Sequence, residues 1–464
     1  MLTALLFTVV LAAPRPNVVV IFCDDLGYGD LTSYGHPTIR TPNLDRMADE
    51  GLRATQFYVA ASVCTPSRAG LMTGRLPVRN GMCGDRAVLF PDSVGGLPQS
   101  ETTMAEMFRD AGYATAMVGK WHLGHLPQYL PTNHGFETYF GIPYSNDMDK
   151  TDAGKAKKQA VWDDPDYRDF NVPLLEGTAA DGCRELERPA VQTNLTRRYT
   201  DRAIEDARRM AGGDRPFFLY LAHNLPHVPL FRSDDFAGVS EAGVYGDVVE
   251  EIDDGVGRLL DALEQLGIDE QTLVVFTSDN GPWLSFGPQG GSPGPLHEGK
   301  GTTWEGGMRV PGIFRWPGTI PAGRIDSGLA STLDLLPTFA ELAGGVLPDD
   351  VAIDGVDQTA WLRGGDSARD AVFFYRGYEL MAVRLNDHKA HFVTRGSYGS
   401  EPRKPVRHDP PLLYDLAADI GERTDLADKR PETLAEIQTL VAEHRRTMRF
   451  ADSQLDRRPA GGGD

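Results

Sequence analysis

Residues 64–75, CTPSRAGLMTGR, combine a cysteine and an arginine with the signals of a short helix. Pro66 suits the first turn of a helix, where its missing N–H costs no hydrogen bond, and Thr73-Gly74 suits the helix end. We therefore expect Cys64 at a helix N-terminus, which is a favourable place for an anion. An isolated cysteine is more often a buried structural residue, so the functional interpretation depends on its flanking residues.

Two clusters of oxygen ligands follow apolar runs that read as buried strands. Asp24-Asp25 follow the first run and Asp279-Asn280 follow the second. Either cluster alone could be an ordinary turn, but strands of a parallel sheet end at one edge, where ligands bind. Three carboxylates and one amide oxygen would suit a hard cation such as Ca²⁺ or Mg²⁺ rather than zinc. The two runs are residues 17–23 and 272–277.

Further candidate groups lie in loops and in the cysteine motif. Lys120 and Lys300 are in glycine-flanked loops, where a solvated lysine is the simpler interpretation of each one alone. His122 and His227 are the candidate acid and base, although an isolated loop histidine is more often incidental. Arg68 would otherwise be a surface residue of the helix that begins at Cys64. Only the combination of these groups points to a catalytic site.

Repeated alternation of strands and helices predicts the fold class. The pattern indicates an α/β domain with a large, mostly parallel central sheet flanked by helices. Short strands within residues 371–393 follow one another without helices, which predicts a small antiparallel sheet, and residues 431–448 predict one amphipathic helix beside it. We expect a catalytic domain over 14–369, a smaller C-terminal subdomain over 370–450, and a disordered tail over 451–464.

Composition limits the classes of partner. The chain has 464 residues and a formal net charge of −20, which argues against a nucleic-acid partner. Residues 1–13 are a short apolar run with a small-residue end, typical of a secretory signal peptide and too short for a membrane span. We therefore expect a periplasmic or secreted protein, or one in a lysosome-like lumen. The polar stretch from Tyr144 to Pro189 is interpreted as a long surface excursion.

Four motifs together resemble the type I sulfatases, which belong to the alkaline-phosphatase-like superfamily, and the resemblance covers nearly the whole chain. Two C-terminal groups of residues resemble the arylsulfatase A branch (PPLLYDL, 410–416) and the N-acetylgalactosamine-6-sulfatase branch (FYRG, 374–377, and HKAHF, 388–392). The four motifs are CTPSRAGLMTGR at 64–75, GKWHLG at 119–124, FTSDNG at 276–281 and GKGTTWEGG at 299–307.

The resemblance implies a modified nucleophile. In this family the motif cysteine, here Cys64, is oxidised to formylglycine by a formylglycine-generating enzyme. A thiol that attacked a sulfate ester would form a stable thiosulfate ester, whereas a hydrated aldehyde has two hydroxyls. One hydroxyl attacks sulfur and the other, once deprotonated, expels sulfate. His122 resembles the base that takes this proton.

The resemblance also implies a calcium site. Residue by residue, it assigns Ca²⁺, with Mg²⁺ as the alternative ion, to Asp24, Asp25, Asp279 and Asn280 together with the modified Cys64.

The remaining site residues resemble groups that hold the nucleophile and the sulfate. Arg68 and Lys120 would hold the formylglycine hydrate and neutralise charge, and Lys120 also counts among the substrate-binding residues. Lys300 and Ser145 would contact the sulfate oxygens, and His227 would support the leaving oxygen. We also expect Trp283, Phe286, His297 and residues 146–189 to line or cover the pocket.

The expected activity is therefore hydrolysis of an aryl sulfate or of a sulfated carbohydrate. Two alternatives stay open. Some relatives in the superfamily use the same aldehyde on phosphonates or phosphodiesters, so matched sulfate and phosphate esters must be compared. A catalytically inactive protein that binds Ca²⁺ and sulfated glycans is the other, although none of the expected residues is missing.

Overall fold

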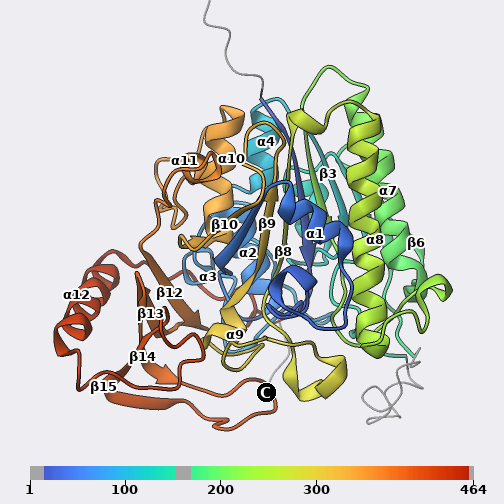
Figure 1. Ribbon diagram of the computed structural model, residues 1–464. Coiled ribbons are helices and arrows are strands. Elements are labelled where there is room, and N and C mark those ends of the chain that lie inside the picture. The colour runs from blue at the N-terminus through green and yellow to red at the C-terminus, as the bar shows by residue number, and fades with distance from the viewer. Residues whose placement is uncertain (1–14, 152–168, 459–464) are drawn as a thin grey trace, which may run out of the picture.

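In the computed structural model, which describes residues 15–151 and 169–458, a large mixed sheet forms the centre of the molecule (Figure 1). Its strand order is β10-β2-β9-β8-β1-β7-β3-β4-β5-β6, and β11 pairs with β2. The central block from β8 to β4 is entirely parallel. The strands are β1 (Asn17–Cys23), β2 (Leu52–Tyr58), β3 (Ala114–Gly119), β4 (Thr138–Gly141), β5 (Leu174–Thr178), β6 (Gly182–Glu187), β7 (Phe217–Ala222), β8 (Thr272–Ser278), β9 (Arg309–Arg315), β10 (Arg324–Asp326) and β11 (Ala330–Ser331).

Helices cover both faces of this sheet, as the buried residues of β1 show. Val18, Val20 and Phe22 pack into a core that includes α2, α4 and α10, whereas Val19 and Ile21 pack into a second core with α1, α7 and α8. A strand buried on both faces explains the continuous apolar run. The helices are α1 (Pro42–Asp49), α2 (Cys64–Thr73), α3 (Pro77–Asn80), α4 (Met104–Asp110), α7 (Leu195–Ala211), α8 (Gly243–Gln265), α9 (Glu305–Met308), α10 (Leu335–Ala343) and α11 (Thr359–Leu362).

The C-terminal part forms a separate antiparallel sheet with one long helix, α12 (Pro431–Thr447), as predicted (Figure 1). The sheet has a fourth strand that the sequence pattern did not reveal. Its strands are β12 (Ala371–Arg376), β13 (Glu379–Leu385), β14 (His388–Thr394) and β15 (Val406–Asp415). The proline pair Pro410-Pro411 lies in β15, the edge strand, where missing N–H groups are tolerated.

A buried network of charges joins the two parts of the chain. Glu305 at the start of α9 accepts hydrogen bonds from Tyr58 at 2.6 Å and from Lys389 of β14 at 2.9 Å. Lys389 also lies 3.1 Å from Glu422, which in turn lies 2.7 Å from His391. The side chains of Glu305, Lys389 and Glu422 are fully buried. The C-terminal sheet is therefore held against the segment that follows Lys300.

Two expectations about irregular segments need correction. The excursion between Tyr144 and Pro189 is not all surface loop, because β5 and β6 extend the main sheet as an antiparallel hairpin. The buried side chains of Phe170, Val172 and Leu174 explain this, since they add to the core. Residues 152–168 of the excursion lie outside the described part.

The expected disordered tail is also wrong for residues 451–458. Leu455 is fully buried in the main core, and the Gln454 N–H donates to the Gly81 carbonyl. Residues 459–464 and the expected signal peptide at 1–13 lie outside the described residues. Within residues 15–151 and 169–458, no helix is both long and apolar enough to cross a membrane.

Candidate active site

The two predicted oxygen clusters meet at the carboxyl ends of neighbouring strands. β1 and β8 pair in parallel with Cys23 opposite Ser278, so the residues that follow them lie together. The Asp25 N–H donates to Asp279 Oδ1 at 3.1 Å, and Asn280 Nδ2 donates to Asp25 Oδ1 at 2.7 Å. Asp25 has a φ of +65°, a conformation that non-glycine residues seldom adopt and that often marks a functional site.

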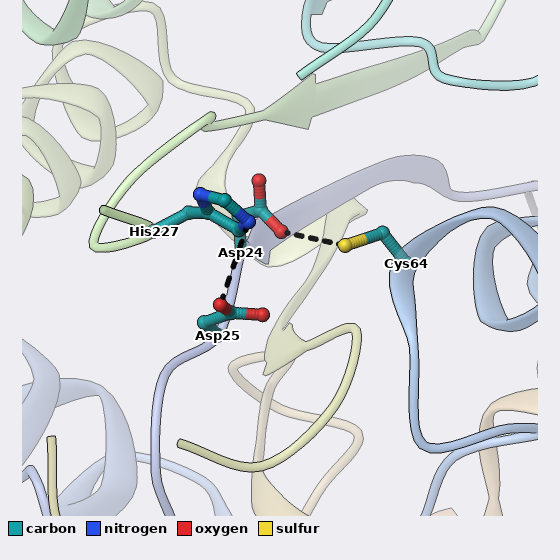
Figure 2. A group of neighbouring side chains, drawn as sticks. All are labelled: Asp24, Asp25, Cys64 and His227. Carbon is teal, nitrogen blue, oxygen red and sulfur yellow. Dashed lines mark hydrogen bonds and ion pairs between the residues drawn. The ribbon is translucent and has the colours of Figure 1, made fainter. Parts of the chain in front are cut away.

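Cys64 begins α2, as predicted, and faces the same cluster (Figure 2). Its Sγ lies 3.4 Å from Asp24 Oδ1 and 3.6 Å from Lys300 Nζ. Burial raises the pKa of the Cys64 thiol well above its usual value, and the Asp24 carboxylate raises it further. The thiolate form is thus disfavoured, which makes the unmodified cysteine a poor nucleophile.

Three buried cations lie among the three buried carboxylates. Arg68 reaches Asp279 Oδ2 at 2.8 Å and Asp24 Oδ1 at 3.7 Å. Lys120 forms an ion pair with Asp24. Burial alone would raise the pKa of Asp24, but Lys120 and other nearby cations hold it well below its usual value. This cluster has fixed positive groups in a site almost closed to water.

The two lysines also connect the cluster to the other predicted residues. Lys120 Nζ donates to Ser145 Oγ at 3.1 Å. Lys300 Nζ lies 2.7 Å from Asp25 Oδ1 and 4.5 Å from the ring centre of Trp283. Burial favours a neutral amine, yet Asp25 raises the pKa of Lys300 above its usual value, so the ammonium form is retained.

His227 joins the cluster directly. Its Nε2 lies 3.6 Å from Asp25 Oδ2 (Figure 2). Its ring centre lies 5.5 Å from that of Trp283. Burial lowers the pKa of His227, and Lys300 lowers it further.

His122 lies beside the cluster in an orientation that leaves one nitrogen free. Its Nε2 contacts the Leu89 carbonyl at 2.9 Å, and because a carbonyl only accepts, Nε2 carries the proton. Nδ1 therefore keeps its lone pair, is buried, and has no hydrogen-bond partner among the described residues. Burial and Lys120 lower the pKa of His122 well below its usual value, so the neutral ring is the stable form.

The described donor set fits a metal ion. Asp24, Asp25, Cys64 and His227 each offer a ligand atom, and these atoms all lie within 4.8 Å of one another (Figure 2). The buried Oδ1 of Asn280 has no hydrogen-bond partner in the described structure, which would be costly without a ligand. Burial raises the pKa of Asp279 to about 7, and Asp24 contributes, which a nearby cation would reverse.

The arrangement adds one candidate to the expected ligand set, and Asp279 stays a candidate because a hydrogen-bonded carboxylate oxygen keeps a second lone pair. Asp279 uses both carboxylate oxygens within the protein, one toward the Asp25 N–H and the other toward Arg68. His227, predicted as a catalytic and substrate-binding residue, also lies among the residues that could hold a metal ion.

Two residues near the site come from the C-terminal part and were not predicted to belong to it: Arg376 ends β12, and Tyr398 lies in the loop between β14 and β15. The Tyr398 N–H donates to the Lys300 carbonyl at 3.1 Å, and Arg376 donates to the Gly301 carbonyl. Local spacing could not have revealed them, because they lie far along the chain from the loop that they hold. Of the expected pocket residues, Trp283 contacts Lys300 and Phe286 packs on Trp283, whereas His297 packs on Trp304.

Two family models match this chain, and curated proteins resemble it over nearly its whole length. A family model described as Sulfatase matches residues 16–346, and one described as the C-terminal region of aryl-sulfatase matches residues 367–460. The chain is 44% identical to arylsulfatase A of Homo sapiens over 486 residues, covering 98% of this chain and 93% of that protein. It is 41% identical to N-acetylgalactosamine-6-sulfatase of Canis lupus familiaris over 482 residues, covering 96% and 88%.

Solved structures share the fold over nearly the whole chain. A sulfatase from Pseudoalteromonas sp. has a TM-score of 0.83 at 30% identity, covering 94% of this chain and 91% of that one. The phosphonate monoester hydrolase of Agrobacterium radiobacter has a TM-score of 0.62 at 20% identity, covering 94% and 96%. At this lower identity the likeness concerns the fold alone.

Proposed function

The chain belongs to the sulfatase family and is a sulfuric ester hydrolase, and we propose that it acts through a formylglycine made from Cys64, assisted by Ca²⁺. Its substrates are aryl sulfates or sulfated carbohydrates, and its partner before catalysis is a formylglycine-generating enzyme. This activity is expected in a periplasm, an extracellular space or a lysosome-like lumen.

The observation that supports this proposal best is the surroundings of Cys64 Sγ. It lies between Asp24 and Lys300, at 3.4 and 3.6 Å, in a pocket where its thiolate is disfavoured. An unmodified thiol would therefore be a weak nucleophile and, after attack on sulfur, would have no simple way to release sulfate. A formylglycine hydrate supplies one hydroxyl for attack and a second whose deprotonation releases sulfate.

We assign the surrounding groups as follows. Lys300, Lys120 and Ser145 bind the sulfate oxygens, because the two ammonium groups and this hydroxyl lie in one hydrogen-bonded network with the cluster. Their fixed positive charge stabilises the charge that develops on the sulfuryl group without reorganisation of solvent.

The proton transfers are assigned to the two histidines. His122 Nδ1 is the base that accepts the proton of the second hydroxyl, since it has a free lone pair in a neutral ring. His227 supports the leaving oxygen from the Asp25 side of the site. Arg68 holds Asp279 and Asp24, and so positions two of the proposed calcium ligands.

Ca²⁺ bound to Asp24, Asp25, Asp279, Asn280 and the modified residue would act as a Lewis acid on the oxygens of the nucleophile and the sulfate. The orphaned Asn280 Oδ1 and the raised pKa of Asp279 support this choice of ligands. Oxygen ligands favour Ca²⁺ or Mg²⁺ over zinc.

The test is the mass of the peptide that contains Cys64 in protein made with a formylglycine-generating enzyme. We expect a loss of about 18 Da relative to cysteine, together with release of sulfate from an aryl sulfate. Cys64→Ala should abolish this release, whereas Cys183→Ala, the matched control, should not. Full activity of protein whose peptide retains an unmodified thiol would refute the proposed nucleophile.

The phosphonate and phosphodiester alternative follows from the aldehyde that some superfamily relatives share, and the comparison with the phosphonate monoester hydrolase adds only a likeness of fold. Hydrolysis rates of the sulfate ester and the phosphate ester of the same aryl alcohol distinguish a sulfatase from a phosphodiesterase or phosphonate hydrolase. We expect the sulfate ester to react faster. The inactive alternative requires a missing site residue, but Cys64, the lysines and the acidic residues are all present and gathered.

A further inference from the structure

A cavity of about 1120 Å³ lies between the beginning of α2 and the C-terminal sheet. Its wall includes Val63 and Pro66, which flank the motif cysteine, and residues of β12, β13 and β14. The lining contains five arginines and three acidic residues, in a protein whose net charge is −20. Arginine therefore gathers here against the overall charge of the chain.

Three of these arginines, Arg376, Arg395 and Arg445, have no carboxylate partner among the described residues, and Arg376 and Arg395 are the two that interact with each other. Arg86 pairs with Asp92 at 2.8 Å, and Arg407 pairs with Glu379 at 2.5 Å. Arg376, in contrast, donates only to the Gly301 carbonyl and lies 5.4 Å from the ring centre of Tyr398, and Arg395 forms no ion pair.

The surroundings of Arg376 make this lack of a partner significant. Burial lowers the pKa of its guanidinium, and the like charge of Arg395 lowers it further. Neither side chain is fully exposed, so bulk water compensates the two charges only in part. Partly buried like charges of this kind are stabilised by an anion placed between them, and guanidinium groups suit sulfate and carboxylate oxygens.

A continuous row of aromatic contacts connects the cavity to the reactive centre. Trp283 lies 4.5 Å from Lys300 Nζ, and the ring of Tyr398 lies 5.9 Å from that of Trp283. Tyr398 in turn contacts Arg376. Aromatic faces are good platforms for the apolar faces of sugars, and the row leads from the sulfate position toward the two arginines.

We propose that this cavity is a second anion subsite, in which Arg376 and Arg395 bind a sulfate or carboxylate group on a sugar adjacent to the one that is desulfated. The proposal rests on the proposed function at Cys64. It defines the substrate class as an oligosaccharide with at least two anionic groups.

The test measures binding separately from catalysis. Tetrasaccharides of chondroitin sulfate, heparin and carrageenan are titrated calorimetrically into the Cys64→Ala variant, with glucose 6-sulfate as the ligand with one charge. We expect at least one tetrasaccharide to bind at least about tenfold more tightly than glucose 6-sulfate, as one additional charge-assisted contact requires. Equal affinity of all three tetrasaccharides and the monosaccharide would overturn the proposal.

Arg395→Gln in the same background identifies the residue responsible. We choose Arg395 because Arg376 also holds the backbone beside Lys300, so its loss would disturb the reactive centre. Arg395→Gln should weaken tetrasaccharide binding about tenfold or more and leave glucose 6-sulfate binding unchanged. Arg446→Gln removes the same charge from an exposed side chain of α12 and should change neither affinity. Equal losses in the two variants would contradict the assignment.

Two further measurements separate folding and catalysis from the subsite. Arg395→Lys keeps the charge and should retain part of the gain, and thermal unfolding must match that of the parent for all variants. If wild-type protein hydrolyses an aryl sulfate but gains nothing from a tetrasaccharide, only the subsite proposal fails. If Arg395-dependent binding is found while Cys64 is unmodified and the protein inactive, the subsite stands and the proposed function fails.

Discussion

Replacement of Lys300 by methionine removes one positive charge from the proposed sulfate site while keeping a side chain of similar length. Lys300 Nζ lies 3.6 Å from Cys64 Sγ, the atom that marks the position of the nucleophile. At this separation two unit charges attract by about 4.6 kcal/mol with an effective dielectric constant of about 20. Half a unit of developing charge would gain about 2.3 kcal/mol on the same scale.

These energies convert into a range for the rate. We expect Lys300→Met to lower kcat between about 50-fold and about 2,000-fold, which spans the effect of removing one preorganised donor. The assay is steady-state hydrolysis of an aryl sulfate, with kcat and KM determined separately. The loss should fall mainly on kcat, because the charge on the sulfuryl group grows in the transition state.

Controls must separate this effect from misfolding, because Lys300 also neutralises Asp25. Lys429→Met, at an exposed position, should leave kcat and KM unchanged. Thermal unfolding and the extent of Cys64 modification must be equal in the compared proteins. A correctly modified and folded Lys300→Met protein with kcat within about fivefold of wild type would refute the assignment of Lys300 to transition-state stabilisation.

Three further predictions concern the metal, the buried network and pH. Removal of divalent cations with EDTA should abolish the hydrolysis of an aryl sulfate, and added Ca²⁺ should restore this activity better than added Zn²⁺. Undiminished activity after complete removal of metal would contradict a role for a metal ion. Lys389→Met leaves Glu305 and Glu422 without their shared buried cation, so the free energy of unfolding measured with denaturant should fall by about 3–5 kcal/mol. An unchanged free energy of unfolding would mean that this network does not stabilise the fold. Burial lowers the pKa of His134 from 6.5 to about 4. Between these two pH values the unfolded chain therefore binds a proton at His134 that the folded chain does not. Stability should therefore be greatest above pH 6.5 and fall by up to about 3 kcal/mol toward pH 4, and His134→Phe should flatten the pH dependence of Tm in this range.

The gathering of the acidic residues at one edge of the sheet could be predicted because its signals are local. Asp24-Asp25 and Asp279-Asn280 each follow an apolar run, and two parallel strands that are neighbours bring such residues together without further information. Pro66 and Gly74 likewise bracketed α2, and Gly74 has the positive φ of +62° that ends many helices.

Other features depend on contacts between distant segments. β9 lies between β2 and β8 and runs antiparallel to both, and no residue pattern within Arg309–Arg315 specifies these neighbours. The role that we assign to His122 depends on the Leu89 carbonyl, which decides the free nitrogen. The hydrogen bonds from Arg376 and Tyr398 to the backbone around Lys300 form only because the C-terminal part packs against this loop. Tertiary structure alone provides this information.

The burial of α2 has a consequence for when the protein can be activated. All ten residues of this helix are buried, and the Cys64 side chain is 2% exposed. An oxidising enzyme cannot reach such a residue once the fold is complete. The groups that cover the Cys64 thiol include Lys300, which is synthesised 236 residues after Cys64 and whose Nζ lies 3.6 Å from the Cys64 Sγ. If Cys64 is converted to formylglycine, as we propose, the conversion must therefore come before the loop that carries Lys300 packs over the thiol, and a chain that folds with its thiol intact would stay inactive.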